Sequence, residues 1–350
     1  MTVIRPEGVT HATASWRPAR GRRRAALRWP RWGCMLAGVT GDAAWLFQAE
    51  RRRLFGLAYR LLGSAADAED VLQAAFEQWI ASDRSAVATP GAWLTTVVTN
   101  LCLNQLGSAR AQRERYAGTW LPEPVVTSDG TLGPLETAEQ RDSVSFGLLV
   151  LLERLTAAER AVFVLREAFG YRYAEIAGIL GRPEGSCRQL HRRAARRLEA
   201  PRRFQPESGQ WRRLVQRFLA AAAGGDVAGL EQLLAEDVLY WGDGEGSGLP
   251  MARKPVAGRS RVALFFARVL PRYLADPRYA VRAELSVAEM NGQLVALGWS
   301  GDALMAVLIP QTDGTRITAL WIVASPGKLA FAAGQLAGVP QAGAAAPGAG

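Results

Sequence analysis

The chain has 350 residues, of which 49% are apolar and 21% charged, so its length and composition suit two or three folded domains. No apolar run approaches the roughly 18 residues of a membrane-spanning helix, and we do not expect an integral membrane protein. Three cysteines and two histidines, without a Cys-x-x-Cys pair, argue against a zinc site and a disulfide framework. We therefore expect no metal, no other cofactor and a cytoplasmic location.

The net charge of +10 is concentrated in two basic blocks. Residues 1–40 carry +7 and residues 182–217 carry +8, so the rest of the chain is slightly acidic. A localised basic block is typical of a nucleic-acid partner. Residues 1–40 lack apolar periodicity, and we interpret them as a disordered extension. Three interpretations of this extension remain open: a solvated tail, a nucleic-acid-binding arm, or sequence upstream of a translation start at Met35 rather than Met1.

Three helices are predicted between residues 41 and 107, where leucines recur at helical spacing. Ser64 and Asp67 have the spacing of a capping box at the start of the second helix. Thr89 and Pro90 provide an N-cap and a first-turn proline for the third. These signals predict a first all-α domain.

Prolines and glycines then break the pattern and predict a linker at residues 108–137. A second all-α domain is predicted at residues 138–200, where Thr156 and Glu159 form another capping box. A second linker is predicted at residues 201–209.

The strongest functional signal is a pair of short helices joined by a glycine-containing turn within residues 171–198, the layout of a helix-turn-helix. Arginine binds guanine O6 and N7 through two hydrogen bonds, or pairs with phosphate. The first turn of the second helix is predicted to face base edges, and its later arginines to hold phosphates. The alternative is an ordinary amphipathic helix with a solvated basic face. The candidate DNA-binding residues are Ser186, Arg188, Gln189, Arg192, Arg193 and Arg196.

Together the two helical domains resemble the core of the extracytoplasmic-function (ECF) RNA polymerase sigma factors. Residues 67–73 with Phe76 are similar to the polymerase-binding helix of that family, residues 90–100 to its −10 region, and residues 173–198 to its −35 helix-turn-helix. The resemblance implies a transcription initiation factor that is not an enzyme. Its implied partners are promoter DNA and core RNA polymerase, contacted at the β′ clamp and the β flap.

The same resemblance implies further site residues. The candidates for the −10 element are Trp93, Thr96, Asn100, Asn104 and Arg110. Aromatic and amide groups of this kind capture unstacked bases. The candidates for polymerase binding are Asp67, Glu69, Asp70, Gln73 and Phe76. Two alternatives remain, since Trp93 equally suits a core position and the acidic residues equally complement a helix dipole.

Residues 210–335 are predicted to form an α+β domain, with helices first and strand-like runs at 237–241, 293–300, 303–309 and 317–323. This order resembles a SnoaL-like cone with a curved sheet, which is fused to the sigma core in the SigJ-type subgroup of the family. Residues 120–124 (Trp-Leu-Pro-Glu-Pro) and 187–189 are also similar to that subgroup. Residues 336–350 are predicted to be a disordered tail.

In the SigJ-type subgroup the fused domain modulates the sigma factor by packing against its core, which implies an intramolecular contact here. The implied regulatory residues are Asp243, Gly244, Gly246, Pro326, Lys328 and Leu329. Two of the subgroup's motifs are present in altered form. Ser247 stands where lysine is usual, and Ser325 and Gly327 stand where asparagine and aspartate are usual.

Two rival functions follow from the same residues: a ligand-sensing helix-turn-helix repressor, and a SnoaL-like enzyme with a DNA-binding tether. Catalysis by such an enzyme needs an acid–base pair in a pocket, and this domain has no histidine. Its acidic candidates show no convincing pairing; they are Asp237, Asp243, Glu245 and Asp302. Trp241, Trp299 and Trp321 either line an apolar ligand pocket or belong to the core. The nature of any small ligand is left open.

Overall fold

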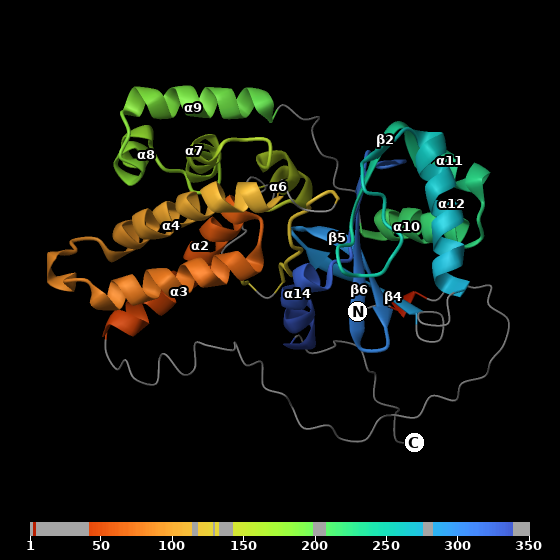
Figure 1. The fold of residues 1–350 in the computed structure, drawn as a ribbon, viewed down its shortest axis with the longest axis horizontal. Helices are drawn as coiled ribbons and strands as arrows, with labels where there is room; N and C mark the ends of the chain where they lie inside the picture. The colour runs from red at the N-terminus through yellow and green to blue at the C-terminus, as the bar shows by residue number, and fades with distance from the viewer. Residues whose placement is uncertain are drawn as a thin grey trace, which may run out of the picture.

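The computed structural model places a helical half beside an α+β domain (Figure 1). The residues it describes are 3–4, 42–113, 118–128, 130–132, 143–198, 208–275 and 283–338. Val3–Ile4, inside the extension predicted to be disordered, forms strand β1 and pairs antiparallel with the sheet. The rest of that extension, the predicted linker at 201–209 except residues 208 and 209, and the tail beyond residue 338 lie outside the described residues.

The first helical domain contains four elements, which are α2 (Asp42–Leu62), α3 (Ala65–Ala81), the 3₁₀ helix η1 (Arg84–Ala86) and α4 (Pro90–Arg113). Ser64 caps α3, because its hydroxyl accepts a hydrogen bond of 3.1 Å from the backbone N–H of Asp67. Helix α4 begins at Pro90 as predicted. It continues past the predicted end at residue 107, because a single interior glycine is tolerated and good helix formers follow it.

The second helical domain consists of α6 (Phe146–Leu152), α7 (Ala157–Glu167), α8 (Tyr173–Leu180) and α9 (Glu184–Arg197). The capping box of Thr156 and Glu159 is present at the start of α7. Gly181 ends α8 in the left-handed region with φ 59°, which a residue without Cβ adopts at no steric cost. The predicted helix-turn-helix is therefore confirmed as α8, this turn and α9.

The two helical domains share one hydrophobic core, which runs from Ala43 in α2 to Leu198 after α9. Polar contacts reinforce it. The buried Arg160 of α7 donates to the carbonyl of Leu61 at 2.8 Å, and Arg53 of α2 donates to the hydroxyl of Tyr171 at 3.2 Å. In this state they form one helical body rather than two units joined by a free tether.

The C-terminal domain is a seven-stranded curved sheet in the order β1-β4-β5-β6-β7-β2-β3. Strand β2 runs parallel to β7, and the other neighbours are antiparallel. Its strands after β1 are β2 (Leu234–Asp243), β3 (Val256–Ala257), β4 (Ala283–Met290), β5 (Gln293–Ser300), β6 (Ala303–Thr312) and β7 (Ile317–Val323). The predicted α+β class is confirmed, although β3 and β4 were not predicted.

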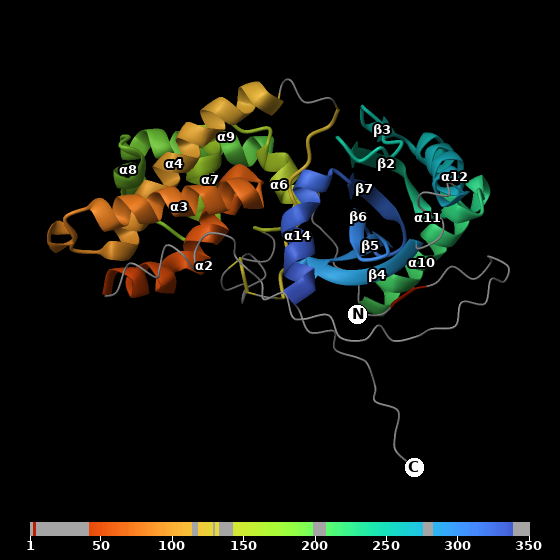
Figure 2. The same cartoon turned by 60° about the horizontal axis from the view of Figure 1, so that its bottom comes forward.

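Helices cover both faces of this sheet (Figure 2). Helices α10 (Ser208–Ala223), α11 (Val227–Leu233) and α12 (Arg259–Ala275) lie on one side. Helix α14 (Pro326–Gly338) lies between the other side and the helical body, and it extends past the predicted boundary at residue 335. Neither α12 nor α14 was predicted.

The core on the α14 side joins the domains. Leu121 and Val126 of the predicted linker and Phe146 of α6 are buried there with Trp321 of β7. Phe146 and Trp321 lie 5.8 Å apart between ring centroids. The linker is therefore part of a hydrophobic core, and the C-terminal domain packs on the helical body through it.

Candidate DNA-binding surfaces and the linker latch

Helix α9 has one buried and one exposed face. Cys187, Leu190 and Ala194 pack against the other helices of the body. Ser186 is partly buried, and the remaining five predicted DNA-binding residues are exposed on α9: Arg188, Gln189, Arg192, Arg193 and Arg196. The structure thus gathers them on the accessible side of the helix.

The arginines of this face differ in their partners. Arg188 pairs with Glu184 at 2.5 Å within α9, and both side chains are about half exposed. Arg193 and Arg197 pair with the buried Glu159 at 3.1 Å and 2.6 Å. Within the described part of the chain, Arg192 and Arg196 form no ion pair, which leaves their charges available to phosphate.

Glu159 holds α9 against the start of α7. Burial opposes its ionisation, yet hydrogen bonds from Thr156 and Arg193 and the charge of Arg197 lower the pKa of the Glu159 carboxyl. Arg193 was predicted as a DNA contact. Its hydrogen bond with Glu159 gives it a second role, which is to position the helix.

The predicted −10 residues lie along α4. Trp93 is partly buried against Trp79, with ring centroids 5.5 Å apart, so it belongs in part to the core. The hydroxyl of Thr96 donates to the carbonyl of Ala92 at 3.1 Å. Asn100 and Asn104 are exposed. Arg110 lies in the same helix, and its side chain is outside the described part of the structure.

One predicted polymerase contact is a core residue. Phe76 is 2% exposed and packs edge-to-face on Phe47, with ring centroids 5.0 Å apart. Its spacing from Leu72 and Trp79 places all three on the buried side of α3, which corrects its assignment to a docking surface.

The other candidates on α3 are accessible to different extents. Glu69 is paired with Arg51 at 2.7 Å, and Gln73 donates to Glu77 at 3.2 Å. Asp70 is exposed, and Asp67 is partly buried. The accessible part of the predicted surface is therefore centred on Asp70.

The linker is fastened to the C-terminal domain by a group that we call the linker latch: Asp243, Lys328 and the backbone of Leu121. Asp243 ends β2 and Lys328 lies in the first turn of α14, and their charged atoms are 2.5 Å apart. The Lys328 ammonium also donates to the Leu121 carbonyl at 2.6 Å. The Leu121 N–H donates to the Asp243 carboxylate at 2.8 Å. The pair thus satisfies both backbone groups of Leu121, and Lys328 lies 4.2 Å from the ring centroid of Trp120.

The other predicted regulatory residues surround this latch. Leu329 is 2% exposed in the core beside it, and Gly246, with φ 73°, lies next to Pro326. Gly244 lies where a Cβ would be 2.5 Å from a neighbouring side chain, so no larger residue fits without a shift. Ser247, which replaces the usual lysine, donates to the Gly244 carbonyl at 2.7 Å and closes the turn.

Glu123 of the linker gives α3 a second cap that sequence reasoning missed. Its carboxylate accepts hydrogen bonds from the Ser64 hydroxyl at 2.9 Å and from the N–H groups of Ala65 and Ala66 at 2.8 Å and 3.2 Å. Burial raises the pKa of the Glu123 carboxyl, while these three donors favour its charged form. Glu123 thereby ties the linker to the first helical domain.

Asn291 connects three segments through one side chain. It has φ 52° and precedes Gly292 with φ 69°, a type I′ turn between β4 and β5. Its amide donates to the Tyr59 hydroxyl at 2.7 Å and to the Val144 carbonyl at 3.0 Å, and its oxygen accepts from the Val125 N–H at 3.1 Å. The Asn-Gly pair between two strand-like runs was a detectable signal for the turn, but the partners were not.

Helix α14 adds contacts along the linker. Gln335 accepts from the Val126 N–H at 2.9 Å and donates to the Thr131 hydroxyl at 3.3 Å. Phe331 stacks on Phe55 of α2, with ring centroids 5.6 Å apart. One helix therefore contacts both the linker and the helical body.

The structure separates the candidates for catalysis. Asp243 is engaged in the latch, whereas Asp237, Glu245 and Asp302 are exposed. Trp241 and Trp321 stack at 5.6 Å on the latch side of the sheet, which supports the core interpretation of these tryptophans. Across the described residues there is no cluster of three metal-ligating side chains and no helix able to cross a membrane.

Comparisons with known proteins agree with this arrangement. Residues 46–112 match the Sigma-70 region 2 family and residues 146–198 match the Sigma-70, region 4 family. The chain is 37% identical over 289 residues to ECF RNA polymerase sigma factor SigJ of Mycobacterium tuberculosis, covering 81% of this chain and 91% of that protein. It is 32% identical over 291 residues to the probable sigma factor SigI of the same species, with 82% and 94% coverage.

A solved structure extends the similarity to the fold. The crystal structure of Mycobacterium tuberculosis SigJ matches with a TM-score of 0.63 at 36% identity, over 82% of this chain and 98% of that chain. These relatives are named as sigma factors, in agreement with the expectation that the chain is not an enzyme. The chain belongs to the family of ECF RNA polymerase sigma factors.

Proposed function

We propose that the protein binds core RNA polymerase in the cytoplasm and directs it to promoters by recognising −10 and −35 elements. The observation that carries this proposal is the exposed basic face of α9, together with the exposed Asn100 and Asn104 of α4. Arg188 and Gln189 lie in the first half of α9, where recognition helices contact base edges. Arg192 and Arg196 follow one and two turns later and suit phosphates.

Polymerase binding is assigned to α3. Its accessible residues, Asp67, Asp70 and Gln73, offer carboxylate and amide groups to the β′ clamp. The β flap is the expected partner of the second helical domain. Phe76 stays in the core and takes no part.

This arrangement of the helical domains is a closed state. The numbers in their names place the −10 and −35 elements 25 base pairs apart, which is about 85 Å of duplex at 3.4 Å per base pair. The two helical domains share one core and direct hydrogen bonds, such as that from Arg160 to Leu61. They cannot reach both elements at once in this arrangement, so promoter binding requires them to separate.

Separation requires release of the linker, and the latch resists that release. Leu121 is held by Asp243 and Lys328, and Val126 is held by Gln335. The C-terminal SnoaL-like domain therefore acts as an intramolecular inhibitor, and weakening the latch increases promoter use.

The test is run-off transcription with purified core polymerase and a genomic promoter pool, using the full chain. Asp243→Asn is compared with Asp237→Asn, a matched change at an exposed position of the same strand. We expect wild type to bind polymerase, Asp243→Asn to give more transcript, and Asp237→Asn to match wild type. Deletion of the domain is a poorer test, because it would expose Leu121, Val126 and Phe146.

Two results would overturn parts of this proposal separately. Folded protein that does not bind polymerase, but binds DNA tightly by itself, would replace a sigma factor with a repressor. Polymerase binding with equal transcript from Asp243→Asn and wild type would retain the sigma factor and remove inhibition through the latch.

A further inference from the structure

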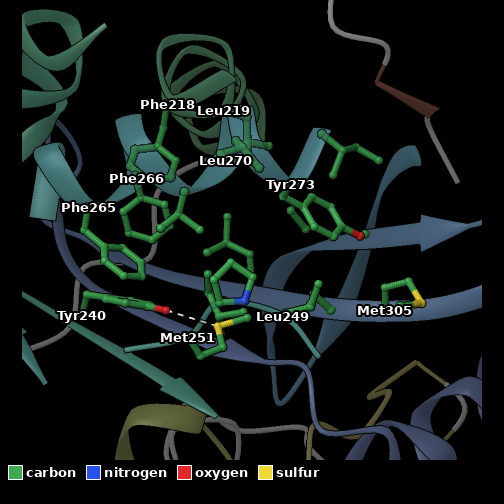
Figure 3. A pocket seen from close by; sticks show the side chains of 18 residues that line it. Phe218, Leu219, Tyr240, Leu249, Met251, Phe265, Phe266, Leu270, Tyr273 and Met305 are labelled. Carbon is green, nitrogen blue, oxygen red and sulfur yellow. Dashed lines mark hydrogen bonds between the residues drawn. The ribbon is translucent and has the colours of Figure 1, made fainter. Parts of the chain in front are cut away.

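An apolar cavity of about 140 Å³ lies on the side of the sheet opposite the linker latch (Figure 3). Helices α10 and α12 and strands β2, β4, β5, β6 and β7 contribute to its wall, together with the segment 249–251. None of the 18 side chains that line it carries a charge. The predicted tryptophans are not among them, so this is a different place from the one expected from the sequence.

The lining defines the chemistry that fits. Aromatic rings dominate one end, where Tyr240 lies 4.9 Å from Phe265 and 5.0 Å from Phe266 between centroids. The hydroxyl groups in the wall belong to Tyr240 and Tyr273, and Tyr240 donates to the sulfur of Met251 at 3.3 Å. An ionised ligand would lose its hydration without gaining a counter-charge, which such a wall excludes.

The volume limits the part of a ligand that the wall can enclose. An apolar cavity of about 150 Å³ lined by Leu, Ile and Phe stays dry and accepts benzene. A cavity of about 140 Å³ with this lining therefore suits a molecule with one ring. Aromatic walls favour an aromatic ring, because edge-to-face contacts add to area burial.

The cavity and the latch share two neighbouring strands. Tyr240 lines the cavity and Asp243 ends the same strand, β2. Ile322 lines the cavity from β7, and soon after it Ala324 donates its N–H to the Asp243 carbonyl at 2.7 Å. Met251 also packs against Gly244, where a Cβ would lie 2.5 Å from its Cγ. Displacement of Met251 by a ligand would therefore press on the residue that follows Asp243.

We propose that this cavity binds a neutral, monocyclic aromatic molecule and that its occupancy changes the stability of the linker latch. The binding step stands on the cavity alone, whereas its consequence for transcription rests on the inhibitory role proposed above. The site is thus a small-molecule input to the C-terminal domain.

Fluorine NMR on the full-length protein tests the binding step. Fluorobenzene is the probe, and 4-fluorobenzoate is the same ring with a charge. Ala306→Leu fills the cavity, and Ala303→Leu makes the same change at an exposed position of β6. We expect saturable binding of fluorobenzene to wild type and Ala303→Leu, affinity lower by about tenfold or more in Ala306→Leu, and no binding of the benzoate.

Two further measurements keep the proposal testable. If Ala306→Leu does not fold, Phe265→Ala enlarges the cavity and should admit 1-fluoronaphthalene, which wild type should reject. Hydrogen exchange at the Leu121 amide, with and without saturating fluorobenzene, then reports the latch directly. We expect its protection to change on binding.

Each contrary outcome is distinct. Absence of saturable fluorobenzene binding, or equal binding of 4-fluorobenzoate, overturns the ligand class. Saturable binding with unchanged Leu121 protection overturns the coupling. Neither readout involves polymerase, so failure here is distinguishable from failure of the sigma-factor proposal.

Discussion

Replacement of Asp243 by asparagine should open the linker latch while keeping its shape. The asparagine oxygen can still accept the hydrogen bond from Leu121, which spans 2.8 Å in the wild type. The change removes the charge that faces Lys328 at 2.5 Å. The largely buried Lys328 ammonium then loses the carboxylate that it faces.

The cost follows from what Lys328 retains. Removing one partner of a buried ion pair costs about 3–5 kcal/mol. Lys328 keeps the Leu121 carbonyl at 2.6 Å and the Trp120 ring at 4.2 Å, and its side chain is 10% exposed. We therefore expect the lower end of the range, about 3 kcal/mol, which is about 150-fold in the opening equilibrium.

Hydrogen exchange measured by mass spectrometry on a peptide that contains Leu121 reports this opening. The exchange rate of that amide should rise by about 150-fold when opening is a rapid pre-equilibrium. Lys328→Met should cost at least as much, because it removes the ammonium that lies 2.5 Å from the fully buried Asp243 carboxylate. The double variant removes both charges, so its cost should be well below the sum of the two.

Two results would refute this reasoning. One is equal exchange of the Leu121 amide in Asp243→Asn and in the surface control Asp237→Asn. The other is a double variant whose cost equals the sum of the single costs, which would mean that the two charges do not stabilise one another.

Three further predictions concern other contacts. Glu159→Gln should lower the free energy of unfolding by about 2 kcal/mol at neutral pH. Because the folded pKa of Glu159 is lowered, the stability that its charge contributes is present above the unfolded pKa of about 4.3 and is lost as the pH falls through the folded pKa. The urea midpoint of the variant should therefore depend less on acid pH than that of the wild type, and an equal dependence in both would contradict this. Asn291→Gly keeps the turn but strands the buried Val125 N–H and removes one of the two hydrogen bonds of the Tyr59 hydroxyl, which still donates to the Glu123 carbonyl; it should lower the free energy of unfolding by about 1–3 kcal/mol, and a thermal shift within error of wild type would count against it. Arg188→Ala should weaken binding to the −35 element by about 1–3 kcal/mol and relax the base preference at that element, as measured by transcription from a promoter library. Arg172→Ala is the control, and an equal loss on all promoter sequences would assign Arg188 to a phosphate contact.

Much of the local structure was predictable because its causes are local. The capping box of Thr156 and Glu159, the proline start of α4 and the turn between α8 and α9 depend on residues within four positions of each other. The bounds of β5 and β7 followed from short apolar runs. The exposed basic face of α9 followed from helical spacing.

The remaining features depend on contacts between distant residues. Phe76 was assigned to a docking surface through family resemblance, although its spacing from Leu72 and Trp79 favours the buried side of α3, and its packing against Phe47 shows that it is core. Residues 120–124 look like a flexible linker from their prolines, yet residues 121–124 are buried because the sheet and α14 cover this segment.

The sequence by itself therefore determined the helices, their caps, the helix-turn-helix and the charge of its face, since hydrogen bonds and side-chain periodicity act over a few residues. The tertiary structure alone decided how the domains are joined. Leu121 meets Asp243 across 122 residues and Lys328 across 207. No local pattern encodes such a meeting, because it arises when the end of β2, helix α14 and the linker bury the same apolar surface and the polar groups trapped there must find partners.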